Sequence, residues 1–310
     1  MSRERDDVNA IAGRHLGRDE QGRKRPAYVA PGRHDPGLLV AVPRRLAREE
    51  IGLKGDALPF VGADVWNAWE CSFLLANGAP VSCVLTFQYP AGSPNLVESK
   101  SCKLYLNSFN MERLAADTVA EGTALFCETV AREIGDCVGA EMRVQATPAH
   151  GRETQPLVRA PESWEVLEER VDICALNFGH ERENPALLKE GAPETGEMKA
   201  RTALLRSNCR ITRQPDWGDL FVWMEGSTLP SPQALLRYVV SLRAENHFHE
   251  EIVETVWLHL AAFQPRALFV AGCYTRRGGL DINPLRASNE ALLHQWADLA
   301  AAPARTTLRQ

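Results

Sequence analysis

The chain has 310 residues, of which 45% are hydrophobic and 24% are charged, and its formal net charge is −5. This composition is that of an ordinary globular protein and excludes a disordered or fibrous chain, and the length suffices for a core without disulfide or metal staples. The acidic balance argues against a protein that holds nucleic acid through its phosphates alone. A nucleobase or a nucleotide remains open as a small ligand.

Eight cysteines are present, and none of them forms a C-x-x-C pair. We therefore expect neither a disulfide scaffold nor a zinc ribbon, but reduced thiols in the cytoplasm. No apolar stretch follows the first residues, so no secretory signal is expected. The longest near-apolar run, about 267–274, is far shorter than the ~20 residues that span a bilayer, so we expect no membrane partner.

Residues 1–45 are rich in arginine, glycine, proline and histidine, and we interpret them as a tail that leads into an arm around the core. Two apolar runs, 64–75 and 81–89, are then separated by Asn77-Gly78 and predict a β-hairpin. The next expected elements are a short helix, a longer amphipathic helix, a strand and a connecting loop: 99–110, 119–134, 137–147 and 148–165.

The second half repeats this order. Strands over 205–212 and 219–225 flank a turn at 214–218, and the following helices, strand, turn and extended segment are expected at 232–243, 246–263, 267–275, 276–279 and 280–283. The segment Tyr105-Leu106-Asn107-Ser108-Phe109 also resembles Tyr238-Val239-Val240-Ser241-Leu242, at an offset of 133 positions. We therefore predict an α+β protein of two tandem modules, 46–165 and 166–310, after the 1–45 arm.

The sequence contains no glycine-rich dinucleotide motif, no P-loop and no H-E-x-x-H zinc motif, so any nucleotide is held in another way. Cys209 lies between Arg206 and Arg210, and nearby cations favour a thiolate. Asp216 follows a proline turn, from which it could donate or accept a proton. On these residues alone, a buried thiol and an ordinary turn residue are the favoured interpretation.

The stretch Glu98-Ser99-Lys100-Ser101-Cys102-Lys103 opens the expected short helix. Ser99 is the expected N-cap, so that free N–H groups together with the two lysines would attract a phosphate. A capped surface helix with solvated lysines is the plainer alternative. A Glu-Lys-Cys set would suit nitrile hydrolysis, but Lys100 points away from the helix face that Glu98 and Cys102 share.

His247-Phe248-His249-Glu250 opens the second long helix. A metal site is not expected there, because no further ligand stands at a suitable interval. The imidazole and carboxylate suit a heteroaromatic ring instead, whose N–H donors a carboxylate accepts. Arg276-Arg277-Gly278-Gly279 presents two guanidiniums to a phosphate or pyrophosphate, although a hairpin turn with exposed arginines explains it equally well.

Taken together, four stretches resemble the signature of the NADPH-dependent 7-cyano-7-deazaguanine reductases, the QueF family. They are residues 98–110, Ser207-Asn208-Cys209 with Gln214-Pro215-Asp216-Trp217-Gly218, Phe248-His249-Glu250, and residues 274–284. The likeness runs from about residue 42 to 310 and is similar to the long, two-module form of the family. Cys102 departs from the pattern, because family members have a bulky apolar residue there.

The resemblance implies two tandem tunnelling-fold modules, antiparallel sheets each backed by two helices, in a homodimer. It implies reduction of the nitrile of 7-cyano-7-deazaguanine to an aminomethyl group by two NADPH, a step towards the tRNA base queuosine. Cys209 would form a covalent thioimide and Asp216 would be the proton donor. The other implied residues bind the deazaguanine (Val97, Glu98, Ser99, His249 and Glu250) or NADPH (Ser99, Lys100, Arg277 and Gly278), and no metal is implied.

The implied chemistry suits these residue types. A nitrile accepts hydride poorly until a soft nucleophile adds to it, and the donors of the ring need a buried carboxylate, a task for Glu250 with Glu98. Three alternatives stay open: another tunnelling-fold enzyme of purines or pterins, a thiol-dependent nitrilase, and a non-catalytic module that binds deazaguanine or tRNA. The lack of a basic excess weakens the tRNA version, and we expect no direct nucleic-acid partner.

Overall fold

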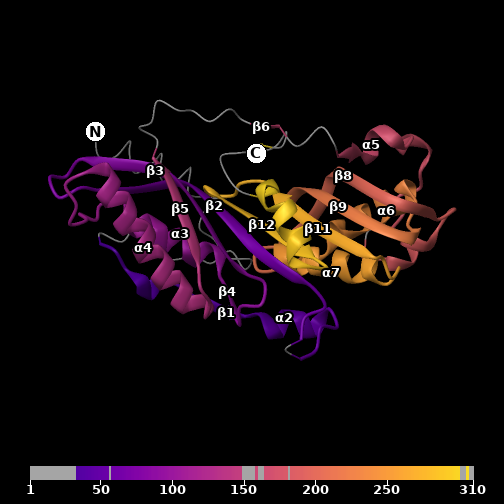
Figure 1. Cartoon of the computed structure of the whole chain (residues 1–310), viewed down its shortest axis with the longest axis horizontal. Coiled ribbons are helices and arrows are strands. Elements are labelled where there is room, and N and C mark those ends of the chain that lie inside the picture. Colours follow the sequence, from indigo (N-terminus) through magenta and orange to yellow (C-terminus); the bar gives the residue numbers. More distant parts are fainter. Residues whose placement is uncertain are drawn as a thin grey trace, which may run out of the picture.

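A computed structural model describes residues 33–55, 57–148, 158–159, 164–180, 182–300 and 305–306 of the chain. These residues form a mixed α+β architecture in which one long sheet crosses both halves of the molecule (Figure 1). Residues 1–32 of the predicted tail and arm over 1–45, and most of the predicted loop over 148–165, lie outside the described residues. Among the helices that are described, none is long and apolar enough to cross a membrane.

The first half of the chain contributes three long strands and two helices. In chain order these elements are β2 (Val61–Leu74), β3 (Pro80–Pro90), α3 (Ser99–Ser108), α4 (Val119–Val138) and β5 (Arg143–Pro148). β2 and β3 form the hairpin that Asn77-Gly78 predicts, and β5 pairs with β3. The predicted strand over 137–147 begins too early, because α4 continues to Val138.

The second half contributes four long strands and two helices in the same order. These elements are β8 (Glu194–Cys209), β9 (Pro215–Leu229), α6 (Pro232–Ser241), α7 (His249–Ala261), β11 (Ala267–Tyr274) and β12 (Leu280–Ala287). The turn predicted over 214–218 is wrong, because β9 already begins at Pro215 and the chain reverses just before it. Asp216 therefore lies in a strand, opposite Ser207 of β8.

Shorter elements connect and flank these two sets. The short strands and α-helices are β1 (Ala41–Pro43), α2 (Arg44–Glu50), β4 (Asn95–Val97), β6 (Val158–Arg159), β7 (Glu165–Val166), α5 (Leu167–Arg170), β10 (Asn246–His247), α8 (Glu290–Gln295) and β13 (Arg305–Thr306). The 3₁₀ helices are η1 (Pro36–Leu38), η2 (Ile173–Ala175), η3 (Pro185–Lys189), η4 (Leu242–Ala244) and η5 (Ala297–Leu299). In the N-terminal arm, β1 pairs with β4 and so brings the arm against the first half.

The expected separate sheets are one sheet in the structure. Its strand order is β10-β8-β9-β11-β12-β2-β3-β5, with β7 also paired to β8. All of its long strands pair antiparallel, and the halves meet where β12 pairs with β2 from Leu280 opposite Ala68 to Ala287 opposite Val61. This pairing removes two exposed strand edges, which would otherwise carry unpaired N–H and C=O groups.

The internal repeat that the sequence indicates is visible in α3 and α6. The two helices have the same length and stand 133 residues apart. In both, a fully buried tyrosine accepts a hydrogen bond at its carbonyl from a serine hydroxyl three residues later: Ser108 to Tyr105 at 2.5 Å and Ser241 to Tyr238 at 2.7 Å. The two helices therefore share their length, their buried tyrosine and the serine that bonds it.

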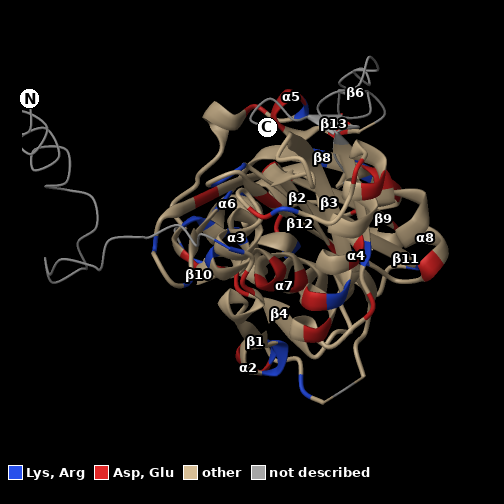
Figure 2. Ribbon diagram, turned by 90° about the vertical axis from the view of Figure 1, so that its left-hand side faces the viewer, with Lys and Arg blue, Asp and Glu red and all other residues tan. Residues whose placement is uncertain are grey.

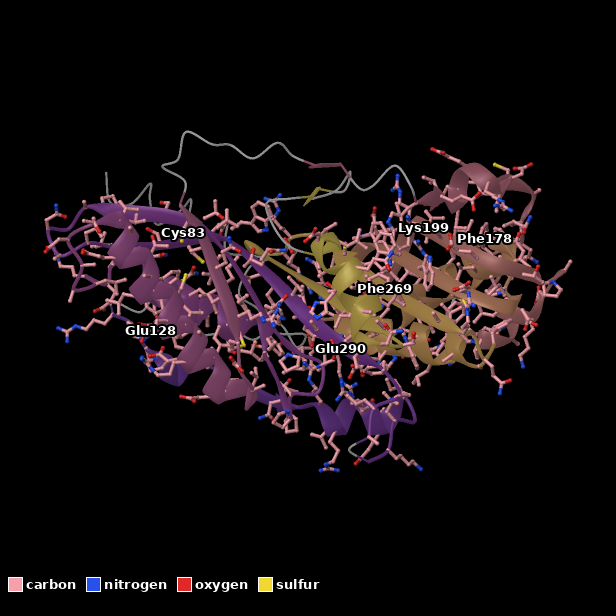
Figure 3. The ribbon with its side chains drawn as sticks, in the orientation of Figure 1. Cys83, Glu128, Phe178, Lys199, Phe269 and Glu290 are labelled. Atoms are coloured by element: carbon pink, nitrogen blue, oxygen red, sulfur yellow. The ribbon has the colours of Figure 1, made fainter. Side chains whose placement is uncertain are left out.

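Four helices, α3, α4, α6 and α7, cover one face of the sheet, and α8 covers the other. This division arises because successive side chains of a strand point to opposite faces of the sheet. Trp66 of β2 packs in the cluster with α3 and α4, whereas its neighbour Val65 packs in the cluster with α8. Figure 3 places Cys83 of β3 in one half of the molecule and Phe269 of β11 in the other. Both halves thus contribute their own buried side chains to the core.

A buried network of ion pairs crosses the junction between β12 and β2. The Arg286 guanidinium donates to Asp64 Oδ1 at 2.8 Å and to Glu254 Oε1 of α7 at 2.8 Å. Arg44 of α2 pairs with the other oxygen of Asp64, and Arg48 of α2 pairs with Glu254 at 2.7 Å. The two cations outweigh the burial of Asp64 and hold the pKa of its carboxyl below the ordinary value. The network thus ties α2, both junction strands and α7 together.

Candidate active site

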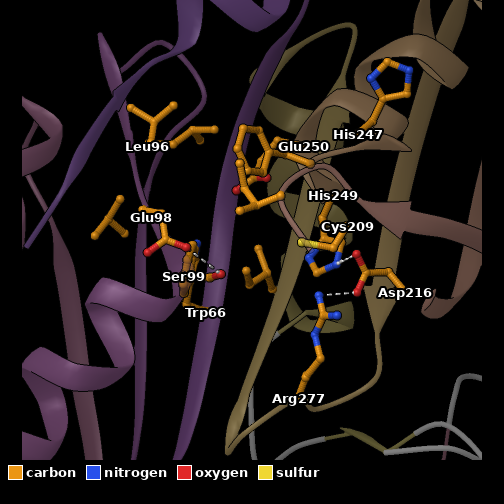
Figure 4. Close-up of a pocket in the computed structure, with 15 residues that line it drawn as sticks. Trp66, Leu96, Glu98, Ser99, Cys209, Asp216, His247, His249, Glu250 and Arg277 are labelled. Carbon is orange, nitrogen blue, oxygen red and sulfur yellow. Dashed lines mark hydrogen bonds and ion pairs between the residues drawn. The ribbon is translucent and has the colours of Figure 1, made fainter. Parts of the chain in front are cut away.

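A pocket opens on the helix side of the junction, between the two halves of the chain. Its cavity volume is about 40 Å³, small beside the roughly 300–1,000 Å³ of typical small-molecule sites. Figure 4 shows Glu98 and Ser99 on one side of it, and Cys209, Asp216 and Arg277 on the opposite side. The lining residues are Val42, Trp66, Leu96, Val97, Glu98, Ser99, Cys209, Ile211, Asp216, His247, Phe248, His249, Glu250, Arg277 and Ile282.

The arm positions the first side of the pocket. Pairing of β1 with β4 sets Ala41 opposite Val97, and the Glu98 N–H donates to the Val40 carbonyl at 2.9 Å. The helix cap differs from the expected one: Glu98, rather than Ser99, caps α3. Its carboxylate accepts from the backbone N–H of Lys100 at 3.0 Å and of Ser101 at 2.7 Å. A carboxylate therefore already occupies the helix start at which the sequence suggested phosphate.

The hairpin between β8 and β9 positions the second side. Cys209 ends β8, and its N–H donates to the Gln214 carbonyl while its own carbonyl accepts from Arg213, both at 2.8 Å. Asp216 stands at the start of β9, so the hairpin itself brings the thiol and the carboxyl to the same pocket. No swing of a flexible turn is needed to bring the pair together.

The surroundings of the cysteines shift the pKa of their thiols in different directions. Burial raises the pKa of Cys71, Cys83, Cys102, Cys127 and Cys137. Burial also opposes ionisation of Cys209, but hydrogen bonds from Thr212 and the backbone, with the charge of Arg277, outweigh it and lower the pKa of this thiol. Cys102, the other thiol that suggested nitrile chemistry, is fully buried and does not line the pocket.

Asp216 is 6% exposed and is contacted by two side chains that carry or accept protons. Its Oδ1 forms an ion pair with Arg277 Nη2 at 2.6 Å, and its Oδ2 lies 3.4 Å from His249 Nε2. Figure 4 marks both contacts. The His249 ring stacks on Tyr274, with 3.9 Å between the ring centroids, which fixes the plane of the imidazole.

Glu250 is a buried carboxyl in the first turn of α7. Two contacts of Glu251 stabilise the start of α7: its carboxylate accepts a hydrogen bond from the Phe248 N–H at 2.7 Å and pairs with Arg210 at 2.9 Å. Burial, with the nearby negative charge of Asp64, raises the pKa of Glu250 to about 8. The ion network that contains Asp64 therefore influences the protonation of a residue in the pocket wall.

Apolar side chains complete the pocket, and sequence reasoning did not select them. Trp66, Leu96, Ile211, Phe248 and Ile282 line it. Trp66 and Ile282 are opposite each other across the β2–β12 pair, a contact that no local pattern predicts. Phe248 and Ile282 did have a signal in the sequence, because both lie in stretches that resemble the family signature. His247 also lines the pocket, paired with Glu251 at 3.1 Å.

Two expected residues, Lys100 and Gly278, do not line this pocket. Gly278 stands beside Arg277 with a φ of +63°, a conformation that side chains rarely adopt. A Cβ at this position would lie 2.3 Å from the ammonium of Lys103, so glycine leaves room for that cation against the backbone of the turn. The mouth of the pocket therefore combines a lysine of α3 with the guanidinium of Arg277, which suits the phosphates of a nucleotide.

A pocket that combines an ionisable thiol, a carboxyl that contacts an imidazole and apolar walls for a flat ring is typical of enzymes that attack their substrate covalently. Two family models match the chain: "Nitrile reductase, 7-cyano-7-deazaguanine-reductase N-term" over residues 31–146 and "QueF-like protein" over residues 215–292. The chain belongs to this family of 7-cyano-7-deazaguanine reductases.

Curated relatives agree with the family models. A protein of Stenotrophomonas maltophilia is 44% identical over 259 residues, which cover 83% of this chain and 89% of the relative. A protein of Dechloromonas aromatica is 41% identical over 256 residues, which cover 82% and 86%. Both are named NADPH-dependent 7-cyano-7-deazaguanine reductase.

Proposed function

We propose that this chain reduces the nitrile of 7-cyano-7-deazaguanine to an aminomethyl group with two NADPH, in the biosynthesis of the tRNA base queuosine. Membership of the family supports the reaction and its cofactor. One observation carries the proposal: Cys209, a thiol of lowered pKa, lines the same pocket as Asp216 and Glu250.

In this proposal Cys209 attacks the nitrile carbon. The carbon–sulfur bond forms as one carbon–nitrogen bond of the nitrile breaks, and the nitrogen takes a proton to give a thioimide. Asp216 supplies the second proton to this nitrogen during reduction, and His249, in contact with Asp216, helps to orient it. The soft sulfur turns a poor hydride acceptor into a C=N group that accepts hydride.

The ring of the substrate would lie between apolar walls that include Trp66 and Phe248. Ionised Glu250 would accept the N–H donors of the ring at the buried end of the pocket. Val97, Glu98, Ser99 and His249 would complete the ring site, although the carboxylate of Glu98 also caps α3 and so has fewer lone pairs to offer. Closure around the ligand would keep water from the imine that forms between the two reductions.

The proposed position of the cofactor is the cationic mouth of the pocket. Arg277 and the Lys103 ammonium against Gly278 would hold the phosphates, with Ser99 and Lys100 at the start of α3. Bound NADPH supplies the two hydrides of the reaction. The left-handed backbone at Gly278 is the feature of this turn that favours a closely approaching anion.

Intact-mass measurement tests the proposal. Protein mixed with 7-cyano-7-deazaguanine in the absence of NADPH should gain the mass of one ligand, and NADPH should discharge the adduct. Cys209→Ala should form no adduct, whereas Cys174→Ala, which removes an exposed thiol outside the pocket, should form it normally. No adduct in the unaltered protein, together with unconsumed NADPH, would refute a thioimide reductase.

We infer further that the two halves are tandem tunnelling-fold modules over 46–165 and 166–310, and that the protein is a homodimer. The shared element order and the α3/α6 repeat support the modules. β5 stands at one end of the strand order, with β3 as its partner among the described residues, so its edge could pair with a second copy. Light scattering that gave a monomer mass would contradict the dimer.

The cytoplasm is the proposed location, and no nucleic acid is a proposed direct partner. All eight cysteines are free thiols, as a reducing compartment requires. In Figure 2 lysines and arginines are interspersed with acidic residues over the ribbon, and the net charge is −5. The proposed substrate is a free base, so the enzyme would act before the base enters tRNA.

A further inference from the structure

Arg277 pairs with the carboxylate of Asp216 inside the pocket and keeps part of its side chain exposed to solvent. In the structure its guanidinium pairs with Asp216 Oδ1 at 2.6 Å and donates to Gln214 Oε1 at 3.2 Å. The side chain is 41% exposed, whereas Asp216 is 6% exposed. The cation therefore reaches from the mouth of the pocket to a buried carboxyl, and its outer side stays open to an anion from solvent.

The pairing conflicts with the task of Asp216 as a proton donor. Conversion of a nitrile to an aminomethyl group adds two hydrides and two protons, and each proton goes to nitrogen. A carboxyl that is held as a carboxylate by a guanidinium has no proton to give. The ion pair seen here is therefore a resting arrangement, and Asp216 becomes a donor only when Arg277 moves away.

We propose that Arg277 exchanges between Asp216 and the phosphate of the nicotinamide nucleotide, so that cofactor binding releases Asp216 to take up the proton it delivers to the substrate nitrogen. The inference rests on the proposed function. It makes Arg277 a positioning residue that couples the arrival of the reductant to the arrival of the proton.

The surroundings of Arg277 allow this exchange. Its neighbour Arg276 lies on the Trp69 ring, 3.8 Å from the centroid, which anchors one side of the turn. On the other side, the Lys103 ammonium lies against Gly278. A phosphate drawn to Lys103 would thus arrive beside the exposed guanidinium of Arg277, and its charge would compete directly with that of Asp216.

Departure of Arg277 from Asp216 also changes the electrostatic surroundings of other groups near this carboxyl. His249 of α7 lies 3.4 Å from its Oδ2, Tyr274 of β11 stacks on that imidazole, and Cys209 of β8 lines the same pocket. The charge of Arg277 is also one cause of the lowered pKa of Cys209. Departure of the guanidinium therefore favours proton uptake by the thiol as well as by Asp216, and a test must separate the two.

Each proton in the proposed reaction has a source and a destination. Solvent protonates Asp216 when Arg277 leaves, and the carboxyl O–H bond breaks as the new N–H bond forms on the substrate. Asp216 returns to a carboxylate after this one transfer, because the nitrogen takes its other proton from solvent as the thioimide forms, before NADPH binds. NADPH, the cofactor of the proposed activity, supplies both electron pairs.

Calorimetry with NADP⁺ tests the exchange without turnover. Titrations of the full chain in buffers of different ionisation enthalpy, near neutral pH, give the number of protons taken up on binding. In Cys209→Ala, which removes the thiol, we expect an uptake of about 0.3 to 1 proton per NADP⁺ bound. Adding Asp216→Asn should abolish the part of the uptake that belongs to Asp216, whereas adding His249→Asn should leave it.

The affinity gives a second, independent result. Asp216 competes with the nucleotide for Arg277, so Asp216→Asn should bind NADP⁺ about three- to tenfold more tightly, the size expected for loss of one partly exposed competing ion pair. Equal proton uptake and equal affinity with and without Asp216 would overturn the exchange. If no variant, nor the unaltered chain, binds NADP⁺, the proposed cofactor itself is wrong, which is a distinct outcome.

Discussion

At the scale of single residues, the surroundings of a thiol decide whether it can react. Cys209 and Cys102 both lie in motifs that suggested nitrile chemistry, yet hydrogen bonds and a nearby cation stabilise the thiolate of Cys209, whereas burial raises the pKa of Cys102. The strongest of the favourable contacts on Cys209 is the side chain of Thr212. The thiolate therefore depends on a residue that no catalytic motif names.

Thr212→Val should raise the pKa of Cys209, because it removes the hydroxyl that hydrogen-bonds the sulfur and keeps the shape of the side chain. We expect alkylation of Cys209 by iodoacetamide at neutral pH to slow about three- to tenfold, measured by mass spectrometry of the Cys209 peptide. Thr129→Val on α4, where the hydroxyl bonds only the Leu125 carbonyl, is the control. Equal slowing in both variants would contradict the assignment.

Glu250 should bind the substrate as a carboxylate. Because its pKa is raised to about 8 by burial and by Asp64, affinity for the deazaguanine should rise as the pH increases towards 8. Glu250→Gln should weaken binding by roughly 1–3 kcal/mol and flatten this pH dependence, because an amide presents a donor to a donor. Titration of ligand across the pH range measures both effects. Glu128→Gln, on the exposed face of α4 (Figure 3), should change neither.

The same carboxyl affects stability with a defined sign. A raised folded pKa means that the folded state holds the proton more tightly than the unfolded state, so stability falls as the pH rises from about 4.5 to about 8. Glu250→Gln should lose less stability over this range than the unaltered protein. Urea unfolding at both ends of the range measures the difference, and parallel curves for the two proteins would contradict it.

At the scale of elements, the proposed cofactor site depends on the backbone of the turn between β11 and β12. Gly278→Ala places a Cβ 2.3 Å from the Lys103 ammonium at a φ of +63°. We expect weaker NADP⁺ binding, by at least about threefold, with unchanged binding of the deazaguanine, because left-handed backbone costs an alanine about 1 kcal/mol and the lysine must move. Gly92→Ala, whose Cβ would meet nothing within 4 Å, is the control for titration of both ligands.

At the scale of the whole molecule, the ion network at the β12–β2 junction joins the halves. Arg286→Met leaves Asp64 and Glu254 buried with fewer cations, and should destabilise the protein by about 3–5 kcal/mol. Arg45→Met removes an exposed pair with Glu49 and should cost less than about 1 kcal/mol. Urea midpoints of the two variants measure the contrast, and similar values would show that the network contributes little.

Local signals in the sequence determine most of the elements. Asn77-Gly78 predicts the β2–β3 hairpin, and the apolar stripe that includes Phe126 and Ile134 predicts α4, because both patterns follow from the period of one element. The errors lie at boundaries. The turn predicted over 214–218 is strand, because pairing with β8 outweighs the turn preference of Pro215-Asp216.

The resemblance to the family also implies eight residues that line the pocket, Val97, Glu98, Ser99, Cys209, Asp216, His249, Glu250 and Arg277. The motifs that carry this resemblance are short local stretches of the sequence, so they can be recognised without the fold. Only the tertiary structure decides that one sheet crosses both halves, that Trp66 and Ile282 form a wall, and that Arg277 holds Asp216. These contacts join residues far apart in the chain, and long-range pairing and charge competition leave no periodic trace in a sequence.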